Sequence, residues 1–452
     1  MTTRSGSEPD LGASTPTSES PPARDDVVRR LGGRRAMLAS ILPNAIEFYD
    51  FYLFGLLAPV LAKVFFPSND SVAGLLYVFT LFAVAFAARP VGAALFGHFG
   101  DRYGRRNTVV MGVLLMVVAT AMIGLAPTYA AVGILAPIWL TVARLLQGIS
   151  TGGQIGGLLT YLVELAPSNH RGRYGAVLNV ASGLGSLLGV LSGQFIALFD
   201  PEDLASWGFR IPFLVSIPLA LTVLVLRWGA PESPEFVEQQ AGALVKQPLL
   251  TTFRLHSRKL LLVIGVVLTQ VVGGFGLLIY LPTYLQTSVH MSQSTAYGYG
   301  VVLSVLWTVL VVPMGALSDR IGRRPVLMGG ALLMAVGVFP AFAMLGSGNV
   351  VLGVLACVLL MVALSAAVGP TSAIFAEQFP TNVRYTACGV GFALATSVFG
   401  GTAPLLGTYV TASLGKPWLF LLYVALAGVV TAAVAFFAVR ETAHGDLATI
   451  AT

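Results

Sequence analysis

Long apolar runs recur along almost the whole chain, from Ala36 to Val439. Many of them approach the roughly 20 residues that a helix needs to cross the hydrocarbon core of a bilayer. Only 10% of the residues are charged and 56% are hydrophobic, with a mean hydropathy of +0.82, whereas soluble domains carry about 25% charged residues. Because polar side chains cannot cover a globule of this composition, its surface must face lipid. The sequence predicts an all-α membrane protein that crosses the bilayer many times.

Twelve spans are predicted between the charged or turn-rich breaks. They cover residues 36–62, 72–97, 107–127, 132–161, 173–199, 211–229, 259–286, 295–317, 326–345, 350–375, 385–410 and 417–439. The longest polar interruption follows the sixth span. This pattern predicts two six-helix halves, 36–229 and 259–440, joined by a cytosolic linker at 230–258. Residues 1–35 and 441–452 are expected to be cytosolic tails, the first of them disordered.

Lys and Arg are distributed unequally between the two sets of loops. With the N-terminus in the cytosol, only Lys63, Arg210 and Lys416 fall outside, whereas all other loop cations fall inside. Positive charge is retained on the cytosolic side of membrane proteins. We therefore expect a cell-membrane protein with both termini in the cytosol. This placement accounts for the net charge of +6 without a nucleic-acid partner.

Two loop motifs repeat between the halves. The segment "GHFGDRYGRR" (97–106) returns as "GALSDRIGRR" (315–324), and "ELAPSNHR" (164–171) returns as "EQFPTNVR" (377–384). Each pair lies between equivalent spans of its half. Two motifs that repeat at nearly one offset indicate two homologous six-helix halves, which is a known plan for transporters.

These motifs supply the candidate gating residues. Their acids can accept hydrogen bonds from helix N-termini or pair with arginines across the boundary of the halves. The arginine pairs can instead serve only to fix topology at anionic headgroups. The candidates are Gly97, Asp101, Arg102, Gly104, Arg105, Glu164, Arg171, Asp319, Arg320, Arg323, Glu377 and Arg384.

The repeated loop resembles the signature of the major facilitator superfamily, which implies the fold of that superfamily. The segments "ARPVGA" (88–93), "RLLQGISTGGQIGG" (144–157), "WGFRIPF" (207–213) and "FPTNVRYTACGVGFALATSVFGG" (379–401) are similar to its metabolite:proton symporter family. That resemblance implies proton-coupled carriage of citrate, 2-oxoglutarate, shikimate, proline or betaine. One departure is Gln154, which stands where members of that family commonly have Glu. Because an amide does not titrate, a proton role at this position is lost.

Two acids lie deep in the first predicted span, in the stretch "NAIEFYDFYLFG" (44–55). Glu47 and Asp50 are about 17 and 21 Å along the helix from Ala36, and they share a helix face. Charged groups inside a bilayer cost several kcal/mol and mark functional sites (about 2.5–3.5 kcal/mol each on insertion scales). We expect this pair to carry the coupled proton. The alternative is that one acid neutralises an arginine on a neighbouring helix.

Arg89 and Arg144 are the two cations expected deep in the membrane. A guanidinium offers a fork of donors that suits a carboxylate, so both are candidate substrate ligands. The competing interpretation is a structural pairing with Glu47 or Asp50, and the R-x-x-Q-G motif of the fourth span makes a structural or proton-relay role for Arg144 equally plausible.

Uncharged polar residues complete the predicted substrate site: Gln154, Asn179, Gln270, Tyr280 and Tyr284. The two tyrosines could form an aromatic box for a quaternary ammonium or belong to the interfacial aromatic belt. The chain is expected to be a monomeric secondary transporter, not an enzyme, with no cofactor or metal. The leading prediction is proton-coupled symport of a small organic carboxylate by alternating access. The alternatives are proton-coupled uptake of a zwitterionic osmolyte such as betaine or proline, and export of a metabolite or drug.

Overall fold

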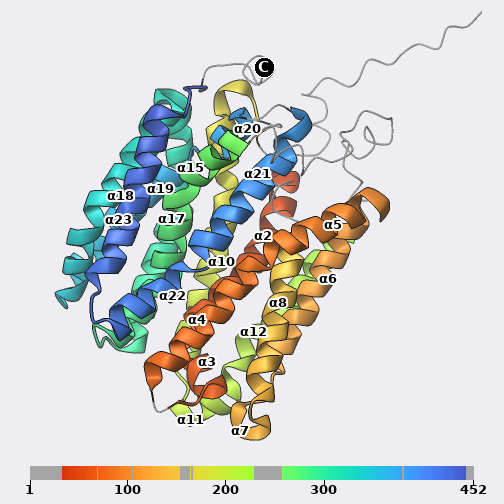
Figure 1. Cartoon of the computed structure of the whole chain (residues 1–452), viewed down its shortest axis with the longest axis vertical. Coiled ribbons are helices and arrows are strands. Elements are labelled where there is room, and N and C mark those ends of the chain that lie inside the picture. Colours follow the sequence, from red (N-terminus) through yellow and green to blue (C-terminus); the bar gives the residue numbers. More distant parts are fainter. Residues whose placement is uncertain are drawn as a thin grey trace, which may run out of the picture.

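The computed structural model describes residues 33–68, 70–103, 105–152, 163, 166–228, 257–378 and 381–443. All regular structure in these ranges is helical. The helices form an elongated bundle (Figure 1). We call its two ends the upper end, where α10 begins at Arg171 and α17 ends at Ile321, and the lower end, where α3 and α11 lie.

The first half contains the elements that precede residue 229. They are α2 (Gly33–Leu56), α3 (Ala58–Phe65), α4 (Ser71–Ala87), α5 (Arg89–Tyr103), α6 (Arg105–Gly124), α7 (Tyr129–Val132), α8 (Leu135–Gly152), the 3₁₀ turn η1 (Ser168–His170), α10 (Arg171–Ile196), α11 (Pro201–Asp203), the π-helical turn η2 (Leu204–Gly208) and α12 (Arg210–Trp228).

The second half contains the elements that follow residue 256. They are α15 (Ser257–Phe275), the π-helical turn η3 (Gly276–Tyr280), α16 (Leu281–Thr287), α17 (Gln293–Ile321), α18 (Arg323–Gly346), α19 (Val350–Val368), α20 (Thr371–Gln378), α21 (Thr381–Ala395), the π-helical turn η4 (Thr396–Gly400), α22 (Ala403–Thr408), the π-helical turn η5 (Tyr409–Ser413) and α23 (Trp418–Phe437).

Within the described residues, each of the twelve predicted spans overlaps a helix or a run of consecutive helices; residues 153–161 of the fourth span lie outside the described part. Within the described ranges, nine helices are long and apolar enough to cross a membrane. The pair α2–α3 makes a tenth span, bent by 63°, where Pro59 near the start of α3 lacks the N–H that would continue the helix. The shorter helices α6 and α8 occupy the two remaining spans. The all-α transmembrane fold is as predicted.

Two helices of the second half are interrupted at glycine-rich segments. The π-helical turn η3 begins at the last residue of "GGFG" (273–276), and η4 ends inside "FGG" (399–401). Single π-turns inside α-helices are frequent at functional sites. The structure therefore has an irregular turn at each of these glycine-rich segments.

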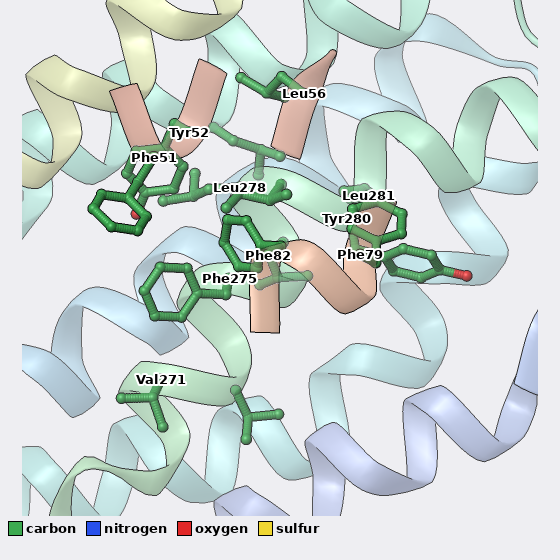
Figure 2. Close-up of a cluster of buried hydrophobic side chains, with 14 of the residues drawn as sticks. Phe51, Tyr52, Leu56, Phe79, Phe82, Val271, Phe275, Leu278, Tyr280 and Leu281 are labelled. Atoms are coloured by element: carbon green, nitrogen blue, oxygen red, sulfur yellow. The ribbon is translucent and has the colours of Figure 1, made fainter. Parts of the chain in front are cut away.

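The two halves contact each other in two places. In one, the pair α10 and α17 pack together; in the other, α4 and α5 pack against the segment from α21 to α22. Close approach in the first pair depends on small residues, since a Cβ built on Gly315 would lie 2.5 Å from the Gly172 carbonyl oxygen. Aromatic rings fill the centre (Figure 2), where Phe82 of α4 packs edge-on against Phe275 of α15 at 6.1 Å between centroids. Small residues and packed rings therefore fill these parts of the boundary between the halves.

Candidate functional site

A cavity lies at the boundary of the two halves. The volume of this cavity is about 60 Å³. Helices α2 and α10 of the first half and α15, α17, α20 and α21 of the second contribute its walls. The lining residues are Asn44, Phe48, Tyr52, Leu178, Asn179, Ser182, Gln270, Val271, Gly274, Phe275, Trp307, Thr371, Ser372, Phe375 and Phe392. Most of them carry rings, amides or hydroxyls, the rest being Leu178, Val271 and Gly274, and among the described residues that line the cavity none is charged.

An amide bridge joins the two halves across this cavity. The Gln270 amide donates to Asn179 Oδ1 at 3.1 Å, and the Thr371 hydroxyl donates to Gln270 Oε1 at 3.3 Å. On the other side, Trp307 Nε1 donates to the Asn179 carbonyl at 2.9 Å. The structure thus brings the predicted ligands Asn179 and Gln270 together in the cavity wall, where partners from two further helices, α17 and α20, hold them.

Sequence reasoning missed most of the aromatic wall. Asn44, Phe48 and Tyr52 follow one another at intervals of four residues, which places them on one face of α2, and all three line the cavity. Tyr52 is held there by a 3.1 Å hydrogen bond between its hydroxyl and that of Ser182. That i, i+4, i+8 pattern was visible in the sequence. Trp307 and Phe375 carried no comparable signal.

Asp50 does not line the cavity but points into the first half. It is 1% exposed, and its Oδ2 accepts a 2.7 Å hydrogen bond from the Thr120 hydroxyl of α6. Glu47, one turn earlier, is 8% exposed, and Arg89 lies within its electrostatic reach. Both predicted proton carriers are therefore buried among the helices of the first half, next to the predicted cations.

Arg89 and Arg144 are held mainly by aromatic rings. The Arg89 guanidinium lies 3.9 Å from the Phe86 ring and 4.5 Å from the Phe51 ring. Arg144 lies 3.9 Å from Phe54 and 5.1 Å from Phe51, on which both arginines stack. Rings attract such cations by roughly 2 kcal/mol when both are desolvated. Both arginines are buried and neither lines the cavity.

Tyr280 and Tyr284 lie inside the second half. The Tyr280 hydroxyl donates to the Gly407 carbonyl at 2.8 Å and lies 2.9 Å from the Thr411 hydroxyl, while its ring packs on Phe420. In Figure 2, Tyr280 lies at the opposite side of the aromatic cluster from Phe51. The two tyrosines are adjacent, with centroids 6.1 Å apart, but the rings around the cavity come from other positions. Their role as ligands stays a prediction.

At the upper end, the repeated loop of the second half binds the first half. Asp319 accepts 2.8 Å hydrogen bonds from the backbone N–H groups of Gly172 and Arg173, at the N-terminus of α10. The same carboxylate pairs with Arg323 at 2.6 Å. A carboxylate at a helix N-terminus satisfies free N–H groups and complements the helix dipole. Asp319 therefore acts as a cap for α10 that comes from the other half.

Glu377 joins this cluster from α20. Its Oε1 lies 3.5 Å from Arg323 Nη2 and 3.9 Å from Arg171 Nη1, and its Oε2 accepts a hydrogen bond from the Thr442 hydroxyl. The four predicted gating residues Arg171, Asp319, Arg323 and Glu377 thus form one buried network across the two halves.

The other predicted gating residues are distributed differently. Arg320 is exposed at the end of α17. Gly97, Asp101, Arg102 and Arg105 lie on α5 and α6, and Arg384 lies on α21, but their side chains are outside the described part. Gly104, Glu164 and the predicted ligand Gln154 lie outside the described residues altogether. Their roles stay predictions.

The chain matches the model of the family described as sugar (and other) transporter over residues 36–246 and 237–452. A proline/betaine transporter of Salmonella typhimurium is 34% identical over 432 residues, which is 92% of this chain and 85% of that protein. The shikimate transporter of Escherichia coli is 32% identical over 415 residues, covering 90% and 95% of the two chains. Among solved structures, the major facilitator superfamily proton:xylose symporter XylE superposes with a TM-score of 0.73 at 22% identity, covering 92% of this chain and 97% of that one.

A two-half helical bundle with a cavity between its halves is the architecture of a membrane transporter. The chain belongs to the sugar (and other) transporter family. It is a multi-pass membrane protein with the major facilitator fold that carries a small solute, and it is not an enzyme.

Proposed function

We propose that this chain is a proton-coupled symporter for a small zwitterion that carries a carboxylate and a quaternary or secondary ammonium group. The observation that carries the proposal is the cavity at the boundary of the halves, lined by six aromatic rings and three amides, with no charged residue among its described lining. It lies between helices of both halves, where alternating access requires the solute to bind.

The chemistry of the walls suits both poles of a zwitterion. The faces of Trp307, Tyr52 and Phe375 attract a desolvated cation. The NH₂ groups of the Asn179 and Gln270 amides supply donors for a carboxylate. A solute without net charge needs no charged residue to neutralise it in such a site. An anion, in contrast, would lose its hydration to aromatic rings and find no positive charge in the described lining. The relatives named for proline and betaine agree with this choice.

Proton coupling is assigned to Asp50, with Glu47 as its neighbour. Both acids are buried in α2, the helix that also lends Asn44, Phe48 and Tyr52 to the cavity. A change of charge at Asp50 therefore acts on the same rigid helix that holds part of the solute site. The proton:xylose symporter shares the fold, which supports coupling of this kind.

Symport of a small organic anion is the second candidate. Arg89 and Arg144 lie one helix layer behind the cavity, and the shikimate transporter is a relative. A rotation of α2 that withdraws Phe51 would expose both guanidinium groups to an anion. In either case we propose that the upper end faces the cytosol and that residues 230–258 link the halves there. A monomer suffices, since one chain supplies the whole cavity wall.

Counterflow into proteoliposomes separates the two candidates, because it measures which solute is carried and needs no proton gradient. Vesicles are loaded with unlabelled solute and diluted into labelled betaine, proline, shikimate or citrate. The proposal expects counterflow of betaine or proline and little of the two anions. Counterflow of an anion alone would refute the zwitterion assignment and favour Arg89 and Arg144 as ligands.

A further inference from the structure

Three hydrogen bonds in series connect Asp50 to Arg144. Arg144 Nη1 donates to Gln147 Oε1 at 2.6 Å, and Gln147 Nε2 donates to Thr120 Oγ1 at 2.9 Å. The Thr120 hydroxyl then donates to Asp50 Oδ2 at 2.7 Å. Gln147 and Arg144 are fully buried and Thr120 is 1% exposed. The chain of bonds runs through α8, α6 and α2, and within the described part no ion pair shorter than 4 Å joins Asp50 directly to Arg144.

The direction of every bond in this series is fixed by chemistry. Arginine has no acceptor, so the Gln147 oxygen must face Arg144 and its NH₂ group must face Thr120. The Thr120 oxygen accepts from that group, which leaves its single hydrogen for Asp50. All donors therefore point from the cation toward the carboxylate, an arrangement in which each bond polarises the next.

The two oxygens of Asp50 differ as a result. Oδ2 is held by the Thr120 hydroxyl, whereas the buried Oδ1 has no hydrogen-bond partner among the described residues. The Ser216 hydroxyl of α12 also faces Asp50, but it donates to the Phe213 carbonyl. A proton that arrives at Asp50 is therefore expected on Oδ1, with the bond from Thr120 to Oδ2 kept but weakened.

We propose that Thr120 and Gln147 are positioning residues that connect Asp50 to Arg144 and set the pH at which the carrier loads its proton. The inference rests on the proposed proton-carrying role of Asp50. The series stabilises the ionised carboxylate through a charge-assisted bond without bringing Arg144 into contact with it. A direct ion pair would oppose protonation more strongly, so the two neutral residues leave Asp50 able to exchange its proton.

Three further titratable groups lie near Asp50. Tyr49 lies beside it on α2, and Glu47 lies one turn away, with Arg89 of α5 facing Glu47. None of these groups belongs to the series of bonds. Substitution of Thr120 by an isosteric apolar residue therefore alters the donor to Asp50 and leaves the surrounding charges in place.

The test is the pH profile of proton-driven solute accumulation in proteoliposomes. Thr120→Val removes the hydroxyl that donates to Oδ2, the one such donor among the described residues. Since a hydrogen bond to a charged group contributes about 1.5–3 kcal/mol and one pH unit corresponds to 1.36 kcal/mol, half-maximal loading is expected to move upward by about 1–2 pH units. Gln147→Leu keeps the hydroxyl and removes the link to Arg144, so its shift is expected to be upward and smaller. Thr120→Ser restores the donor and is expected to restore the profile.

Thr141→Val is the matched control, because the Thr141 hydroxyl of α8 donates to the Pro137 carbonyl of its own helix and, among the described residues, has no other hydrogen-bond partner. The inference would be overturned if Thr141→Val and Thr120→Val shifted the pH of half-maximal loading equally. It would also be overturned if Thr120→Val left this pH unchanged while Asp50→Asn no longer accumulated solute. In that second case the proton role of Asp50 stands. If Asp50→Asn still accumulates solute on a proton gradient, the proposed coupling itself fails, and the inference fails with it.

Discussion

Replacing Asp319 by Asn is expected to open the upper end of the bundle. Asp319 is 9% exposed and holds Gly172 and Arg173 of the other half through two backbone N–H groups. The side-chain amide of Asn has one acceptor oxygen, so the variant loses one of these two hydrogen bonds. Its NH₂ group then faces the backbone N–H of Gly172 or Arg173, and two donors cannot bond to each other. It also loses the negative charge that pairs with Arg323 at 2.6 Å.

The magnitude follows from these contacts. A hydrogen bond to a charged acceptor contributes about 1.5–3 kcal/mol, and a carboxylate at a helix N-terminus contributes a further ~0.3–1 kcal/mol. The closed upper end should therefore be destabilised by about 2–4 kcal/mol. At 1.4 kcal/mol per factor of ten, the ratio of closed to open molecules falls by roughly 30- to 1000-fold.

Spin labels at His170→Cys and Ile321→Cys report the opening, because both positions are exposed beside the network. The two native cysteines, Cys357 and Cys388, are buried and are replaced by Ala in this background. We expect Asp319→Asn to add a population at longer distance. Arg320→Gln, which changes an exposed neighbour, should leave the distances unchanged. Identical distance distributions for Asp319→Asn and its parent would refute the gating role.

Three further changes have defined outcomes. Trp307→Leu should raise the KM for a zwitterion about 2- to 30-fold, since a ring attracts a desolvated cation by roughly 0.5–2 kcal/mol, and initial uptake rates measure this. Gly315→Ala should lower both transport rate and melting temperature, because its Cβ would meet the Gly172 oxygen at 2.5 Å, whereas Gly329→Ala, with open space around it, should not. Burial raises the pKa of Glu441, but backbone N–H donors outweigh burial and hold this pKa below its usual range. Glu441→Gln should therefore cost less than ~1 kcal/mol of stability at pH 7, because the group is exposed. In melting curves, the stability difference between the variant and the wild type should vanish as the pH falls from about 4.3, the usual pKa of Glu, through the lower pKa that Glu441 has in the folded protein.

The transmembrane plan was predictable because spans of apolar residues follow bilayer thickness and depend little on tertiary contacts. The repeated loops likewise led to Asp319, Arg323 and Glu377, since an acid and arginines that recur at equivalent positions signal a shared contact. The structure adds what the repeat does not contain: Asp319 caps a helix of the opposite half.

The substrate site was only partly predictable. Asn179 and Gln270 reach the cavity wall, but Arg89 and Arg144 stack on rings behind it. The apolar and polar residues of helix α2 are spread around the helix without one apolar face, so its sequence does not say which side lines the cavity and which packs into the first half. Asp50 and Tyr52 are two positions apart and face different surroundings for this reason. Packing against α10 and α12 decides the rotation.

The most direct test of proton-coupled zwitterion symport is proton movement that accompanies solute entry. Proteoliposomes that hold a trapped pH indicator in weak buffer receive betaine or proline with no imposed gradient. The account predicts acidification of the lumen that is stoichiometric with labelled solute taken up, and its loss in Asp50→Asn. Solute entry into wild-type vesicles without any change in lumenal pH would contradict it.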